Sequence, residues 1–69
     1  MPERQLKNRL KVLRAENDLT QEALAQKVDV TRKTINVIEA GDYSPSVSLA
    51  LAIAEVFETT VNDVFFFEI

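Results

Sequence analysis

Polar and positively charged side chains gather within a few residues near the middle of this 69-residue chain. Arg32 and Lys33 supply guanidinium and ammonium donors, and Thr34 adds a hydroxyl and a methyl group. In a DNA major groove, Arg pairs with guanine, Lys meets guanine or phosphate, and Thr contacts base edges. Asn36 could read adenine and Val37 could meet a thymine methyl, although both also suit a helix surface. These residues could read bases, or they could simply form the solvated start of a helix.

Gln21 is a second candidate for contact with nucleic acid. It follows Thr20, which stands where a helix cap is expected, so nearby backbone amides would point outward and could hold a phosphate. The side-chain amide would add a hydrogen bond. The simpler alternative is a helix-start residue without a ligand. The complete candidate set for DNA contact is Gln21, Thr31, Arg32, Lys33, Thr34, Asn36 and Val37.

Two short helices joined by a tight turn, over about residues 20–40, are predicted to position these side chains. Thr20 and Thr31 are hydroxyl residues at N-cap positions, and each precedes an apolar spacing typical of a helix. Gly41 stands where the end of a helix favours a residue of positive φ. Because the turn is so short, the helices must cross, which is the geometry of a helix-turn-helix.

Three further helices are expected around this pair, over 4–17, over Val47 to Phe57 and over about 60–64. The first has leucines at i, i+4 and i+7 from Leu6. The second is apolar almost all round, so more than one of its sides must be covered. The chain ends in a Phe-rich run with high strand propensity, and the nearest candidate partner strand is Met1 to Gln5. The fold class predicted is all-α, with a short antiparallel sheet from the chain ends.

The C-terminal half has more apolar surface than one small core can cover. We therefore predict that residues 47–69 contain a two-fold homodimer interface. The residues expected in this interface are Leu49, Ile53, Val56, Phe65, Phe66, Phe67 and Ile69.

Composition excludes several classes of function. The chain has no Cys and no His, so it has no disulfide, no Cys/His metal site and no Cys- or His-based catalysis. No paired carboxylates or Gly-rich phosphate loop occur either, so we expect no enzyme, no cofactor and no bound metal. No signal or membrane segment is visible, and no small-molecule effector is evident. We expect one cytoplasmic domain over residues 1–69.

The charges are unevenly distributed along the chain. Residues 1–33 hold all eight Lys and Arg with five acids, a net charge of +3. Residues 34–69 hold six acids and no base, a net charge of −6. Such a chain can offer a basic face to phosphates and keep its acidic half away, although accidental segregation on a soluble surface is the alternative.

The order and spacing of these segments resemble the Xre, or lambda-repressor-like, family of helix-turn-helix regulators. The resemblance covers roughly residues 5–66, and the stretches that show it are Leu13-Arg14, LTQEALAQKV at 19–28, TRKTINVIEAG at 31–41, SPSVSLALAIAEVF at 44–57 and TVNDVF at 60–65. It implies a five-helix domain that dimerises, binds double-stranded DNA and represses transcription. The alternative is a protein-interaction module on the same fold, such as an antitoxin that occupies a toxin.

The resemblance also bears on five charged positions. Arg14 and Glu39 lie at the edges of apolar stripes, and matching positions in the family form an internal ion pair. The chain departs from the family at Asp29 and Glu58, where Gly is frequent, and at Asp42, where Lys is common. Asp tolerates the left-handed conformation better than most residues, so the fold is still expected. An acid at position 42 could weaken binding to phosphate.

Overall fold

Hydroxyl side chains begin four helices of the computed structural model, which describes residues 4–68. In each, the side-chain oxygen accepts a hydrogen bond from the amide three residues later, at 3.0 to 3.3 Å. The capping residues are Thr20, Thr31, Ser46 and Thr60. These local bonds satisfy backbone amides that a helix start leaves free, which confirms the predicted starts.

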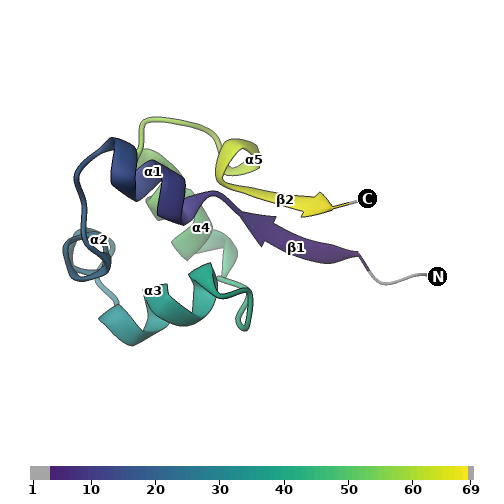
Figure 1. Cartoon of the computed structure of the whole chain (residues 1–69), viewed down its shortest axis with the longest axis horizontal. Coiled ribbons are helices and arrows are strands. Elements are labelled where there is room, and N and C mark those ends of the chain that lie inside the picture. Colours follow the sequence, from purple (N-terminus) through teal and green to yellow (C-terminus); the bar gives the residue numbers. More distant parts are fainter. Residues whose placement is uncertain (1–3, 69) are drawn as a thin grey trace.

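Five helices and a two-stranded antiparallel sheet follow one another along the described chain (Figure 1). Their bounds are β1 Gln5–Asn8, α1 Leu10–Glu16, α2 Gln21–Lys27, α3 Arg32–Glu39, α4 Val47–Val56, α5 Val61–Val64 and β2 Phe65–Glu68. The helices form one body, and the ribbon of β1 and β2 extends from its side. Within residues 4–68, no helix is both long and apolar enough to cross a bilayer.

Residues of positive φ end four of the helices. At the end of α3, Gly41 has φ 84°, its amide donates to the carbonyl of Ile38, and Asp42 donates to Val37, both at 3.0 Å. The same pair of bonds closes α1, α2 and α4, with Asp18, Asp29 and Glu58 at φ 54°, 59° and 53°. This motif satisfies carbonyls at a helix end and requires the left-handed conformation.

The predicted helix over 4–17 is wrong in its first part. Gln5–Asn8 instead form β1, and α1 begins only at Leu10. β1 pairs with β2 in the register Leu6 opposite Phe67, so the expected sheet does form, but with a partner strand that starts at Gln5. Met1 to Glu3 lie outside the described residues. Residues 5–8 satisfy their backbone hydrogen bonds by pairing with β2. The leucine spacing alone could not show that they would do so.

One hydrophobic core joins the five helices and β2, and Leu6 of β1 packs against it. It consists of Leu10, Leu13, Leu24, Ala25, Ile35, Ile38, Ala50, Ile53, Ala54, Val64 and Phe65. α4 contributes three of these residues, and it ends at Val56, one residue before the predicted end. The helix-turn-helix pair contributes four, so the core holds α2 and α3 in place.

The burial of two residues corrects the predicted dimer interface. Ile53 is fully buried and Phe65 is 8% exposed, so both pack inside the protomer itself and offer almost no surface to a partner. Leu49 and Val56 are partly buried against the same core. Phe66 and Phe67 are exposed, whereas Ile69 lies outside the described residues.

Candidate nucleic-acid interface

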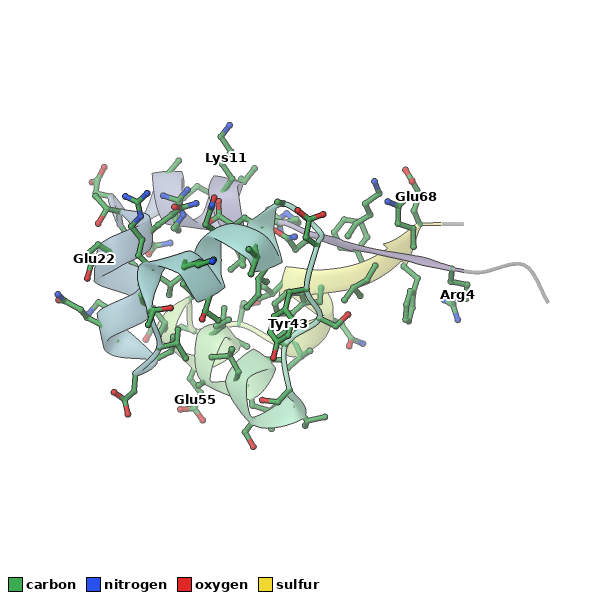
Figure 2. The ribbon with its side chains drawn as sticks, turned by 90° about the horizontal axis from the view of Figure 1, so that it is seen from below. Arg4, Lys11, Glu22, Tyr43, Glu55 and Glu68 are labelled. Carbon is green, nitrogen blue, oxygen red and sulfur yellow. The ribbon has the colours of Figure 1, made fainter. Side chains whose placement is uncertain are left out.

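α2 and α3 pack against each other and are joined by a short turn at Asp29. Asp29 takes the left-handed conformation, and Val30 donates back to the carbonyl of Ala25 at 3.0 Å. This reversal leaves only a few residues between the helices, as a helix-turn-helix requires. α3 lies at the outside of the molecule, and Figure 2 views the protein from that side.

The predicted contact residues lie mainly on the free surface of α3. Thr31, Arg32, Lys33 and Asn36 are exposed, while Thr34 and Val37 are partly buried. Ile35 and Ile38 point into the core, which turns the other residues of the helix outward. The structure thus brings six of the seven candidates together on one helix and its cap.

The seventh candidate, Gln21, joins α2 to α3. Its side-chain Nε2 donates to Asn36 Oδ1 at 3.4 Å and to Glu39 Oε1 at 3.3 Å. Gln21 is therefore the first residue of α2 and is also hydrogen-bonded to α3. Any anion held at that helix start would be positioned relative to α3 by these bonds.

Glu39 also receives the guanidinium of Arg14 from α1. Arg14 Nη2 donates to Glu39 Oε1 at 3.0 Å, and Nε donates to Oε2 in a two-point contact. The two side chains are only 16% and 10% exposed, and Arg14 Nη1 adds a bond of 3.0 Å to the carbonyl of Leu19. The hydrogen bond to Glu39 raises the pKa of Arg14, although burial acts in the opposite direction. Arg14 is thus occupied internally.

Several other basic side chains are also used within the protein. Lys7 lies 3.8 Å from Glu68, Arg9 donates to the carbonyl of Asp63 at 3.4 Å, and Arg4 stacks on Phe67. Those that form no ion pair, side-chain hydrogen bond or contact with an aromatic ring within residues 4–68 are Lys11, Lys27, Arg32 and Lys33. The basic half of the sequence is therefore not one free basic face, and the available charge near α3 is concentrated at its start.

Two residues of this region were missed by the sequence interpretation. Asn8 donates to the carbonyl of Ile38 at 3.0 Å and so reaches the end of α3 from β1. Tyr43 is 54% exposed and lies near the middle of the face seen in Figure 2. A large aromatic beside a polar loop was a signal for Tyr43, since exposed aromatics often mark interaction surfaces. No local signal identified Asn8.

The matched sequence profile is described as helix-turn-helix, of the Xre-like type, and it spans residues 10–64. The chain belongs to this family. The profile includes α1 to α5 and leaves out both strands. The predicted family and the predicted five-helix fold with a small sheet are therefore confirmed.

Similar proteins occur in archaea and bacteria. An uncharacterised helix-turn-helix transcriptional regulator of Methanocaldococcus jannaschii is 49% identical over 91% of this chain and 96% of its own length. YgzD of Bacillus subtilis, with the same description, is 48% identical over 91% and 96%. These relatives are named as regulators, and none of them is named as an enzyme.

A solved structure has the same fold. The crystal structure of a candidate DNA-binding protein from Bacteroides fragilis superposes with a TM-score of 0.79, covering 88% of this chain and 98% of that one. The two sequences are 24% identical, so the likeness concerns the arrangement of the helices and strands.

Proposed function

We propose that this helix-turn-helix protein is a sequence-specific DNA-binding repressor that acts as a homodimer on an inverted repeat. The observation that carries the proposal is the exposed row of donors on α3, with Arg32 and Lys33 at its start. The first residues of a recognition helix are those that reach base edges in the major groove. The names of the relatives as transcriptional regulators support the same function.

The polar contacts behind α3 support its use as a rigid reading element. Glu39 accepts bonds from Arg14 of α1 and Gln21 of α2, so three helices share one carboxylate. A side chain that reads bases must be held in place by its own scaffold. Gln21, at the start of α2, is suited to hold a phosphate and to set the register of the helix on the duplex.

A second copy of the chain would cover apolar surface that the protomer leaves open. Besides Phe66 and Phe67, this surface includes Val47 and Leu51 of α4, which are 78% and 51% exposed. Leu51 and Val47 also line an apolar groove with Leu6. In a two-fold dimer the two α3 helices would enter successive major grooves, with half-sites about 10 bp apart. A dimer bound in this way would repress by blocking polymerase.

The test is selection of bound sequences from random duplex DNA, followed by titration of the selected operator. We expect an inverted repeat. Arg32→Ala should weaken operator binding by about 1–3 kcal/mol and relax the preferred sequence. Gln21→Ala should weaken binding to operator and random DNA alike. Binding should also weaken steeply with salt, because phosphate contacts release counterions.

A matched control for Arg32→Ala is Lys27→Ala. It also removes one positive charge, but from the last residue of α2. Lys27 lines a hollow with Glu55 of α4 and with no residue of α3, so its loss should leave the preferred sequence unchanged. If Arg32→Ala keeps wild-type affinity and preference, α3 does not read the operator. If no sequence is selected and the protein co-purifies with a second small chain, it is an interaction module instead.

A further inference from the structure

The end of α3 returns the chain onto the outer face of the same helix. Gly41 adopts φ 84°, and Asp42 donates to the carbonyl of Val37 at 3.0 Å. This hydrogen-bonded reversal is local and follows from the glycine. Tyr43, six residues after Val37, lines the same hollow as Val37.

A shallow hollow lies between this loop and α3. Its lining residues are Thr31, Lys33, Thr34, Val37 and Tyr43. Four of the five are residues that the sequence predicts to contact DNA, and the fifth is the exposed Tyr43. Most of the lining is apolar, and Val37 and Tyr43 are its aliphatic and aromatic residues.

The polar groups around the hollow are arranged at its edges. Thr31 Oγ1 and Thr34 Oγ1 are hydrogen-bonded to each other at 3.0 Å, so each already has a partner. Lys33 adds one positive charge, with Arg32 next to it. An apolar floor beside cationic groups suits a ligand that is negatively charged overall but apolar at one point.

In the major groove, the apolar group that a base pair presents is the 5-methyl of thymine. We propose that the hollow between Val37 and Tyr43 receives a thymine methyl group, so that Tyr43 determines specificity from outside the recognition helix. The inference depends on the proposed function, since it places α3 in a major groove. Lys33, which lines the same hollow, would then be able to meet a neighbouring phosphate or guanine.

The ring of Tyr43, rather than its hydroxyl, is what the site uses. Removing the hydroxyl should therefore leave the preference for thymine intact, whereas removing the ring should abolish it. If Tyr43 only bonded a phosphate through its hydroxyl, the Phe and Ala variants would both lose that bond and would weaken binding equally. Tyr43 is about half exposed and is not one of the core residues, so we expect both variants to fold.

The experiment uses the full chain and its selected operator. Each thymine of one half-site is replaced in turn by deoxyuridine, which removes only the 5-methyl group. We expect one position at which wild type loses about fourfold in affinity, the value for burying a single methyl group. Tyr43→Phe should keep this loss, while Tyr43→Ala and Val37→Ala should bind both operators equally. Melting curves of each variant test that it is folded.

Three results would overturn the inference. If wild type binds its operator and no uridine weakens binding, the hollow holds no methyl group, although the proposed function stands. If Tyr43→Phe loses as much affinity as Tyr43→Ala, the hydroxyl acts and the ring does not. If wild type selects no DNA sequence, the proposed function fails and this inference fails with it.

Discussion

The side-chain amide of Asn8 joins the sheet to the end of the outer helix. Its Nδ2 donates to the carbonyl of Ile38 at 3.0 Å and to that of Glu39 at 3.4 Å, while its Oδ1 accepts from the amide of Leu10 at 3.1 Å. One residue thus satisfies backbone groups at the end of α3 and at the start of α1. These groups are partly buried, so their loss would be costly.

Asn8→Ala should lower the free energy of unfolding by about 1–3 kcal/mol, because the amide of Leu10 loses its acceptor and the carbonyls of Ile38 and Glu39 each lose a donor. Urea denaturation measures this. Asn62→Ala, on the exposed surface of α5, is the matched control and should change stability by less than about 0.5 kcal/mol. Equal stability of the two variants would show that Asn8 does not hold α3.

The ion pair of Arg14 and Glu39 should be sensitive to the loss of one partner. Arg14→Ala leaves a nearly buried carboxylate uncompensated, and we expect a loss of about 3–5 kcal/mol. Replacing both residues by Met removes both charges and should be less damaging than the single change. Thermal and urea unfolding would test this, and a wild-type melting temperature for Arg14→Ala would contradict it.

Glu58→Gly should stabilise the protein. Glu58 has φ 53°, a conformation that costs a residue with a side chain about 1–2 kcal/mol and costs glycine almost nothing. We expect a gain of about 1 kcal/mol, seen as a melting temperature about 4–8 °C higher. Asp29→Gly is the comparison, and it should gain less because Asp tolerates this conformation better. A lower melting temperature for Glu58→Gly would refute the argument.

The pKa of Asp63 should lie below its ordinary value of 3.8. The hydroxyl of Thr59 donates to its carboxylate, and the hydroxyl of Thr60 acts in the same direction. The carboxylate therefore contributes stability above pH 3.8, and this is lost as pH falls through the lowered pKa. In Thr59→Val the pKa should rise back toward 3.8, as NMR titration would show. Thr34→Val removes a hydroxyl that makes no contribution to the pKa of Asp63, so it should leave this pKa unchanged.

The proposed dimer should depend on the exposed part of α4. Leu51 is 51% exposed, so Leu51→Glu should spare the folded protomer and place a charge in the dimer interface. Light scattering at micromolar concentration should report a dimer for wild type and a monomer for this variant. Val12→Glu makes the same change at 50% exposure on α1 and should remain dimeric. A monomeric wild type would rule out the dimer.

The helix starts and ends were open to prediction because they depend on neighbours in the chain. Thr20 and Thr31 bond to amides three residues ahead, and Gly41 permits a reversal completed by the next residue. Such bonds join residues that are close in the chain and do not depend on distant residues. The sequence alone therefore determined the helix-turn-helix and the donors on α3.

Contacts between distant residues were decided only by the tertiary structure. The leucine at position 6 suits a helix or a strand, and only pairing with Phe67 makes it a strand. Ile53 and Phe65 are as apolar as an interface residue, but the protomer's own core buries them first. Likewise Asn8 reaches a carbonyl 30 residues away, which no periodicity could indicate. Local hydrogen bonding is encoded in short stretches, whereas burial depends on how the whole chain packs.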